Sequence, residues 1–322
     1  MMGEGRYGGR LIFAEYTKRG NYGVDFFFVL SGFIILFAHA SQIEKPGSWR
    51  EYLKRRFVRL YPVYWLYTGV FVALLVLIGG TDAAMPSNLV DWVGAVTLVR
   101  FSEVIPPLPV AWSLFHEIAF YAMFLLLMVH RRIGLAAFAL WALLCIVFFH
   151  HLGEVPPTPW NVYTASANLW FFFGMGACLL YWRLNRGWWP AIAGLAIVAL
   201  AATLDRENRL WPLLLVTGFA LAVAGVAKLE DSGLFSCPRW LVYAGNASYT
   251  IYLTHESCAG VLLKVAMKTG AYGWMGGQAV YLLVLPATIA LGCLAYATVE
   301  RPLLHRLSGK ARQRSTQQRP AY

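Results

Sequence analysis

Apolar stretches long enough to cross a lipid bilayer recur along this chain, and they constrain its fold more than any other feature. A membrane-crossing helix needs about 20 predominantly apolar residues, and little sequence is left between these stretches for a soluble domain. Residues 89–101 form a shorter segment that contains Asp91 and Arg100, so we expect a loop helix or a re-entrant helix there. We predict about nine spanning helices, at residues 22–40, 61–78, 110–129, 133–149, 167–182, 188–204, 211–227, 245–267 and 278–299.

The composition indicates that the solvent around these helices is lipid. The 322 residues are 59% apolar and only 13% charged, whereas a soluble domain carries roughly 25% charged residues. The mean hydropathy is +0.55. We therefore predict an all-α, polytopic transmembrane helix bundle. It comprises an extracytoplasmic N-terminal segment (1–21), a membrane domain (22–302) and a basic cytoplasmic tail (303–322).

The formal net charge of +11 belongs mainly to the connections between the apolar stretches. Most Lys and Arg residues fall on one side of the predicted bundle, as the positive-inside rule expects of the cytoplasmic side. This pattern predicts a membrane protein with a cytoplasmic C-terminus, and it argues against a nucleic-acid partner. The N-terminal segment is also basic and would have to be translocated without an upstream helix, so we expect that the chain begins one helix late.

The five cysteines predict neither a disulfide framework nor a metal site. Their number is odd, and their positions lack metal-ligand spacing. Most lie inside apolar stretches, where a free cysteine behaves as a small buried hydrophobe. We therefore expect no bound metal.

A basic elbow after the first apolar stretch contains Arg55, Arg56 and Arg59. Side chains three and four residues apart share a helical face, and guanidinium groups suit phosphates such as those of coenzyme A. The alternative is a topology anchor without a ligand. Asp25 lies near the other membrane face, and a charge in or beside hydrocarbon is costly enough to suggest a functional role.

A second polar set lies on a predicted helix at Ser113, Glu117 and Tyr121. These residues are spaced four apart and share one face, whereas His116 points elsewhere. A carboxylate among apolar helices suits general acid–base chemistry. The alternative is an interhelical glutamate that only forms structural hydrogen bonds.

A third polar set follows Gly245, where Ser248, Tyr252 and His255 form one helical stripe. Such a stripe is typical of a bundle interior or a wet cavity. The alternative for His255 is a packing residue whose hydrogen bonds are satisfied. Near the end of the last stretch, Glu300 is interpreted as part of an ion pair that caps the bundle.

In this order, the polar sets resemble the acyltransferase-3 family of integral membrane O-acyltransferases. The resemblance extends from Tyr22 to Pro302. The sequence of the basic elbow is most similar to bacterial enzymes that acetylate exopolysaccharide or O-antigen sugars of lipopolysaccharide. The matching residues are Gly23-Val24-Asp25, Phe27-Phe28-Val29-Leu30-Ser31-Gly32-Phe33, Arg56-x-x-Arg59-x-Tyr61-Pro62, Trp112-Ser113-Leu114-x-x-Glu117-x-x-Phe120-Tyr121, Ser248-Tyr249-x-Ile251-Tyr252-Leu253-x-His255 and Glu300-x-Pro302.

This resemblance implies a ten-helix bundle that moves an acyl group, usually acetyl, from cytoplasmic acyl-CoA to a carbohydrate hydroxyl. It implies that Arg56 and Arg59 engage the donor and that Glu117 and His255 line the transfer path. The resulting hypothesis assigns catalysis to Glu117, His255 and Asp25, donor binding to Arg55, Arg56 and Arg59, and the substrate path to Trp112, Ser113, Tyr121, Ser248 and Tyr252.

The sequence departs from the family pattern at its start. The family's first helix carries an Arg and a His that is thought to be catalytic, and residues 1–20 resemble the loop after that helix. Two alternatives to an active enzyme stay open: a transporter or flippase of a lipid-linked saccharide, and a catalytically silent relative. The absence of an internal repeat gives the transporter no support.

Overall fold

The computed structural model describes residues 22–78, 85–104, 106–151, 153–204 and 211–307. Within these residues every regular element is helical, which confirms the predicted all-α fold. The predicted segment 1–21 and residues 308–322 of the predicted tail lie outside the described residues. The elements are α2 (Tyr22–His39), η2 (Ala40–Gln42), α3 (Ser48–Ile78), α4 (Leu89–Thr97), η3 (Pro109–Ala111), α5 (Trp112–Val129), α6 (Arg131–Val147), α7 (Pro159–Thr164), η4 (Ser166–Asn168), α8 (Leu169–Arg183), α9 (Trp188–Thr203), α10 (Trp211–Asp231), α11 (Arg239–Lys268), α12 (Ala271–Ala295) and the π-helical turn η5 (Tyr296–Glu300).

Five helical segments in the described part of the chain are long and apolar enough to cross a membrane. The shorter helices α6, α8 and α9 have 17, 15 and 16 residues, and α11 has 30 residues but a more polar sequence. The nine-residue α4 agrees with the expected short helix. The five segments are Tyr22–Gln42, Ser48–Leu77, Pro109–Val129, Trp211–Asp231 and Ala271–Leu307.

The basic residues predicted to form an elbow lie inside α3. This helix runs unbroken from Ser48 to Ile78 and includes Pro62. No Gly or Pro interrupts the sequence between Ser48 and Pro62, so the backbone has no reason to leave the helix there. The chain instead reverses before Ser48, at Gly47 with a positive φ of 76°. Arg55, Arg56 and Arg59 are therefore fixed on one rigid element.

The short helix α4 is held against α3 by side-chain donors. Tyr61, Tyr64 and Trp65 donate hydrogen bonds of 2.6, 2.7 and 2.9 Å to the backbone carbonyls of residues 97, 95 and 96. The last carbonyls of a helix have no partner within the helix, and in hydrocarbon they cannot turn to water. These donors therefore satisfy the end of α4 and fix its position beside α3.

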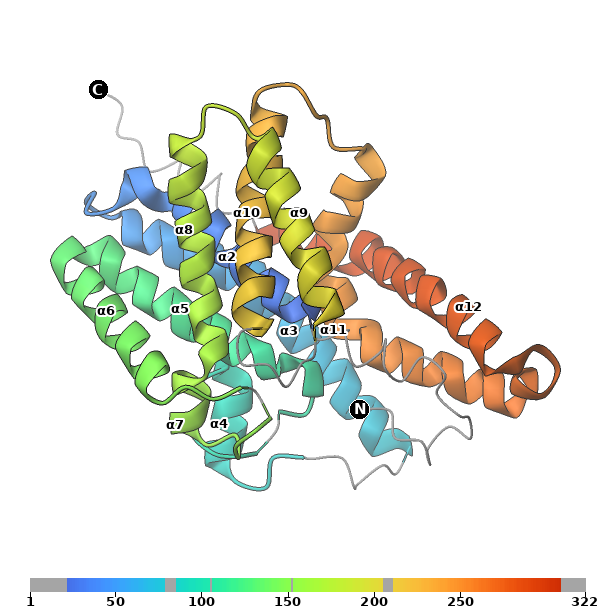
Figure 1. The fold of residues 1–322 in the computed structure, drawn as a ribbon. Coiled ribbons are helices and arrows are strands. Elements are labelled where there is room, and N and C mark those ends of the chain that lie inside the picture. Colours follow the sequence, from blue (N-terminus) through green and yellow to red (C-terminus); the bar gives the residue numbers. More distant parts are fainter. Residues whose placement is uncertain (1–21, 79–84, 105, 152, 205–210, 308–322) are drawn as a thin grey trace, which may run out of the picture.

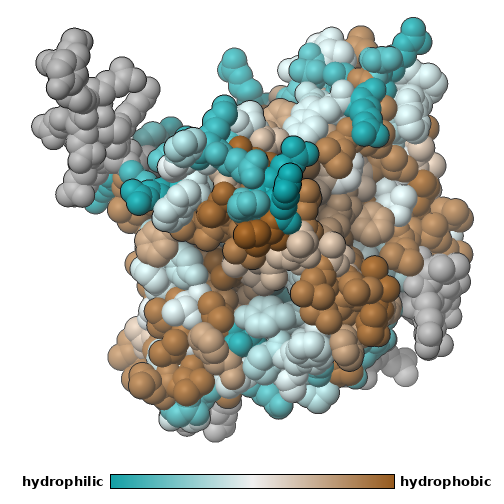
Figure 2. Space-filling view, turned by 90° about the vertical axis from the view of Figure 1, so that its left-hand side faces the viewer, coloured by the Kyte–Doolittle hydropathy of each residue, from teal (hydrophilic) through white to brown (hydrophobic). Residues whose placement is uncertain are grey.

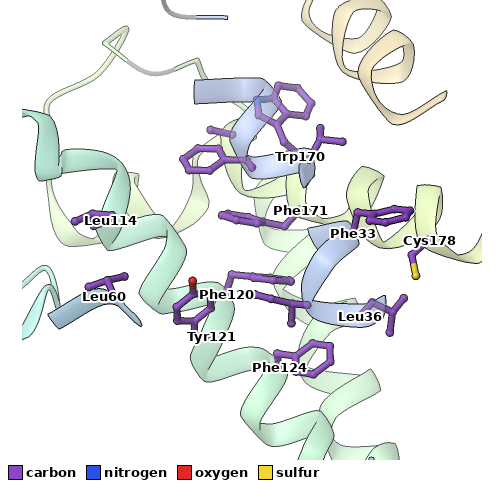
Figure 3. Close-up of a cluster of buried hydrophobic side chains, with 14 of the residues drawn as sticks. Phe33, Leu36, Leu60, Leu114, Phe120, Tyr121, Phe124, Trp170, Phe171 and Cys178 are labelled. Carbon is purple, nitrogen blue, oxygen red and sulfur yellow. The ribbon is translucent and has the colours of Figure 1, made fainter. Parts of the chain in front are cut away.

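The bundle core forms where α2 crosses α8 (Figure 1). Gly32 and Gly174 let the two backbones approach closely, because a Cβ on Gly174 would lie 1.9 Å from the carbonyl oxygen of Val29. Beside this crossing, Phe120 stacks on Phe171 with ring centroids 4.5 Å apart (Figure 3). Figure 1 shows α5 and α6 on one side of this core and α11 and α12 on the other.

Apolar side chains cover much of the outer surface. Figure 2 shows brown residues across the middle of one face, with many hydrophilic residues near its upper edge. Exposed apolar residues of this kind include Leu135 on α6 and Leu285 on α12, at 51% and 65% exposure. A soluble protein rarely exposes such continuous apolar surface, so this is the surface of a multi-pass membrane protein.

The basic connections gather at one end of the bundle. The α2–α3 connection meets the α5–α6 connection, where Arg131 donates its backbone N–H to Glu44 at 2.9 Å. At the ends of α8 and α10, the Lys228 ammonium lies 5.1 Å from the centroid of the Tyr181 ring. These contacts join connections that the sequence places on the same, basic side of the membrane.

The α2–α8 crossing yields a stability prediction. We expect Gly174→Ala to lower the free energy of unfolding by about 2 kcal/mol or more, because the added methyl group clashes with backbone rather than with a movable side chain. Gly176→Ala on the same helix is the matched control, since a Cβ there meets nothing within 4 Å. Thermal unfolding in detergent measures both variants, and equal shifts would contradict this account of the crossing.

Candidate functional site

A cavity of about 370 Å³ lies where α2, α3, α5 and α11 meet. Apart from the polar residues named below, its lining consists of apolar side chains and one glycine, Gly245. Pockets of this size are typical of small-molecule sites, which combine apolar walls with a few placed polar groups. The polar residues that line it are Ser31, Arg56, Arg59, Ser113, Glu117, Tyr121, Asn246, Ser248, Tyr249 and Tyr252.

The carboxylate of Glu117 is the centre of a hydrogen-bond network in this cavity. Tyr121 donates a short hydrogen bond to Glu117 Oε1, and Ser31 donates to the same oxygen at 3.4 Å. Ser113, Glu117 and Tyr121 all line the cavity, so the predicted shared face is confirmed. Among the described residues, no hydrogen bond is formed by the second oxygen, Oε2. That oxygen can accept a proton or a hydrogen bond from a ligand.

The second polar pair of the cavity joins α5 to α11. Tyr252 donates its hydroxyl proton to the backbone carbonyl of Val110 at 2.6 Å. The Ser113 and Tyr252 oxygens lie 2.7 Å apart. Because a tyrosine hydroxyl carries one proton, Ser113 is the donor in this contact. The lone pairs of Ser113 are left to accept from a ligand, and Ser248 of α11 also lines the cavity.

Arg56 is held by neutral groups. Its Nη2 lies 3.0 Å from Nε2 of His39, which is 1% exposed. Its guanidinium lies 5.8 Å from the ring centroid of Tyr52 and 5.7 Å from that of Tyr121. Among the described residues, Arg56 forms no ion pair, and its buried Nε has no hydrogen-bond partner. The positive charge of Arg56 is therefore not neutralised by a carboxylate of the described residues.

Arg59 is held by a carboxylate instead. Arg59 Nη1 lies 3.0 Å from Glu300 Oε1, and the side chains are 43% and 0% exposed. Thr250 donates to the other oxygen of Glu300 at 2.5 Å. The guanidinium also lies 5.9 Å from the Tyr249 ring centroid. Glu300 does form the expected ion pair, with a partner 241 residues earlier in the chain.

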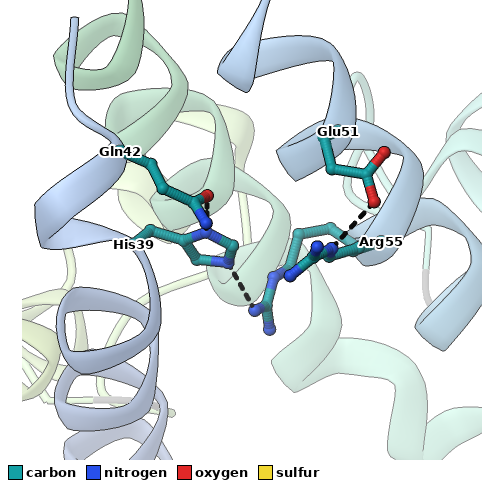
Figure 4. A network of polar contacts seen from close by, with 5 residues as sticks. His39, Gln42, Glu51 and Arg55 are labelled. Atoms are coloured by element: carbon teal, nitrogen blue, oxygen red, sulfur yellow. Dashed lines mark hydrogen bonds and ion pairs between the residues drawn. The ribbon is translucent and has the colours of Figure 1, made fainter. Parts of the chain in front are cut away.

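Four of the predicted site residues do not line the cavity. Arg55 is exposed and pairs with Glu51 at 3.0 Å (Figure 4). His255 donates from Nδ1 to the backbone carbonyl of Tyr252 at 2.6 Å and is half-buried one turn beyond the cavity. Trp112 and Asp25 are also half-buried outside the lining.

His116 points away from the cavity, as its position beside Glu117 predicts. Its Nδ1 lies 2.8 Å from Oδ1 of Asn168, and both residues are fully buried. Asn168 in turn donates to the backbone carbonyl of Val162 at 3.0 Å. These contacts make His116 a packing residue between α5 and η4.

Sequence reasoning missed five residues of the site: Ser31, Asn246 and Tyr249 in the cavity lining, and His39 and Tyr52 beside Arg56. His39 and Tyr52 lie behind Arg56 and come from the end of α2 and the start of α3. Ser31 lies in the apolar run of α2 and reaches Glu117 on α5. The only sequence signal for Ser31 is its position in the run that resembles the family, and His39 gives none beyond its place at a helix end.

The described residues contain no candidate metal site. No group of three or more His, Cys, Asp and Glu side chains lies together among them. The cavity instead combines two guanidinium groups, one carboxylate and several hydroxyls. Such a set can bind an anionic ligand and accept a proton from a hydroxyl.

Comparisons with known proteins agree on one family. A family profile described as an acyltransferase domain matches residues 2–297. The exopolysaccharide production protein ExoZ of Rhizobium meliloti is 29% identical over 325 residues, covering 94% of this chain and 96% of the relative. Acyltransferase MdmB of Streptomyces mycarofaciens is 28% identical, covering 95% and 86%. Nodulation protein 10 of Rhizobium leguminosarum is 27% identical, covering 88% and 82%. No solved structure matches the chain.

The ion pair between Arg59 and Glu300 predicts strong coupling in stability. Arg59→Met alone leaves the buried Glu300 carboxylate without a cation and should lower the free energy of unfolding by roughly 3 kcal/mol, near the lower end for such pairs because Arg59 is partly exposed. We expect Arg59→Met/Glu300→Gln to be more stable than Arg59→Met. Denaturation of the single and double variants in detergent measures this coupling, and additive effects would contradict it.

Proposed function

The chain belongs to the acyltransferase-3 family, and on this premise we propose that it transfers an acyl group from acyl-CoA to a hydroxyl of a cell-surface or exported carbohydrate. It is a multi-pass membrane acyltransferase. The name of the relative ExoZ, an exopolysaccharide production protein, supports a carbohydrate acceptor. Family membership also favours an acyltransferase over the transporter alternative. Acetyl is the acyl group that the proposal expects.

The observation that carries the proposal is that Arg56, Arg59 and Glu117 line the same cavity. Coenzyme A carries a pyrophosphate and a 3′-phosphate, which guanidinium groups bind with charge-assisted hydrogen bonds. Arg56 lines the cavity and forms no ion pair with the described residues, so its charge is available to such an oxygen. The proposed donor therefore has its phosphates at the arginines and its thioester toward Glu117.

The reaction joins the acceptor oxygen to the acyl carbon and breaks the carbon–sulfur bond of the thioester. The hydroxyl proton leaves the acceptor, and the thiolate takes up a proton to become free coenzyme A. We assign Glu117 as the general base, because its Oε2 makes no hydrogen bond with the described residues while Oε1 is held by Tyr121 and Ser31. Ser113, Ser248 and Tyr252 would orient the substrates. The catalytic roles assigned to His255 and Asp25 from the sequence remain predictions.

The proposed orientation places the arginine end of the cavity in the cytoplasm of a bacterial inner membrane. Arg56 and Arg59 lie near the start of α3, after the basic α2–α3 connection. The positive-inside rule assigns such a connection, and with it the C-terminus, to the cytoplasm. Acyl-CoA is a cytoplasmic metabolite, so the donor would reach the cavity from the basic end.

The test is an acyl-transfer assay on the full chain. The protein is purified in detergent or nanodiscs and incubated with radiolabelled acetyl-CoA and the polysaccharide fraction of its host. Label in the polysaccharide and release of free thiol support the proposal. Absence of both, with no binding of coenzyme A, would refute it.

Arg56→Gln should raise the KM for acetyl-CoA about tenfold or more, because hydrogen bonds to charged groups contribute roughly 1.5–3 kcal/mol. Lys54→Gln is the matched control, since it removes one exposed cation from the same helix outside the cavity. Steady-state kinetics compare the two. Equal effects would indicate that Arg56 acts only through the overall charge of this membrane face.

Glu117→Gln should lower kcat at least about 100-fold, since general bases commonly contribute 10²–10⁴. The amide oxygen still accepts from Tyr121 and Ser31, so the fold and the donor KM should change little. Single-turnover kinetics with saturating acetyl-CoA measure the chemical step. A full rate in this variant would remove Glu117 from catalysis.

A further inference from the structure

The two arginines of the cavity are held in electrically different ways. Arg59 is paired with the fully buried carboxylate of Glu300. Arg56 instead contacts a histidine, His39. It forms no ion pair with the residues that the structure describes. Glu300 neutralises the charge of Arg59, whereas His39 leaves the charge of Arg56 uncompensated.

The hydrogen bonds of His39 require the neutral imidazole. Guanidinium groups donate and never accept, so Arg56 Nη2 donates to Nε2 of His39 across 3.0 Å. Nε2 is then the acceptor nitrogen, and the ring proton lies on Nδ1. From there it is donated to Oε1 of Gln42, 3.0 Å away (Figure 4). A doubly protonated ring would lose the contact with Arg56 and repel it.

His39 is built into the protein as a fixed support. It is 1% exposed, and the Tyr52 ring packs against it edge-on at 5.1 Å. The Phe124 ring lies 6.4 Å away on α5. His39 does not line the cavity, so it acts on a ligand only through Arg56. With both ring nitrogens bonded, the imidazole has one orientation.

We propose that His39 is a positioning residue that holds Arg56 toward the cavity while leaving its positive charge available to the phosphates of the acyl donor. This inference rests on the proposed function. It explains why a neutral acceptor occupies a position where a carboxylate would bind the guanidinium more tightly. A carboxylate there would form an ion pair with Arg56 and compete with the donor phosphates for the same cation.

The experiment compares His39→Gln with His39→Glu in the full-length protein. These side chains have the same length, and each can place an oxygen near the position of Nε2, so they differ mainly in charge. We expect His39→Gln to raise the KM for acetyl-CoA by no more than about threefold and His39→Glu to raise it by about tenfold or more. The kcat values should differ much less. The Kd for coenzyme A should follow the KM and lose salt sensitivity in His39→Glu.

Gln42→Glu provides a second, independent variant that touches no atom of Arg56. A carboxylate at residue 42 favours the doubly protonated His39, which cannot accept from Arg56. The donor KM should therefore rise in this variant as well. Lys54→Gln controls for the change in surface charge, and melting temperatures confirm that each variant is folded.

Each outcome bears on one proposal. Equal donor KM values in folded His39→Gln and His39→Glu proteins, or an unchanged KM in Gln42→Glu, would overturn the role of His39. Failure of the unsubstituted protein to bind coenzyme A would overturn the proposed function itself. Should His39→Glu fail to fold, the Gln42→Glu result alone decides.

Discussion

Polar groups inside this bundle must find partners within the protein, because hydrocarbon offers none. The structure meets this constraint by joining helices that are distant in sequence. Tyr61, Tyr64 and Trp65 satisfy the end of α4, and Thr250 and Arg59 satisfy Glu300. In the cavity, some polar groups do not have a partner within the described part of the protein. Oε2 of Glu117 is left for a substrate that brings its own polar atoms, and Arg56 keeps a charge that no carboxylate of the described residues neutralises.

The positions of the cavity walls are set by the apolar packing of α2 and α5 against α8. The Gly32–Gly174 crossing brings α2 against α8, and stacked rings of Phe120 and Phe171 fix α5 beside them. Ser31 and Glu117 belong to these same two helices, α2 and α5. A shift of one helix would therefore move the base and its hydrogen-bond donor apart, so the core sets the geometry of the site.

The sequence predicted the helical class, the shared face of Ser113, Glu117 and Tyr121, and the presence of Arg56 and Arg59 at one site. Periodicity of 3.6 residues suffices for such local relations. It could not separate Arg55 from Arg56, because both lie on faces that a helix could turn inward, and only the packed bundle shows Arg55 exposed. It could not find His39 or identify Arg59 as the partner of Glu300, since both contacts join helices whose pairing no single sequence reveals.

The contact between Arg59 and Glu300 spans 241 residues, so a cavity-lining arginine depends on a carboxylate that is synthesised long after it. During translation, which delivers the N-terminal helices first, Arg59 enters the membrane long before the carboxylate that neutralises it exists. The nascent bundle must therefore tolerate an unpaired cation until η5 emerges.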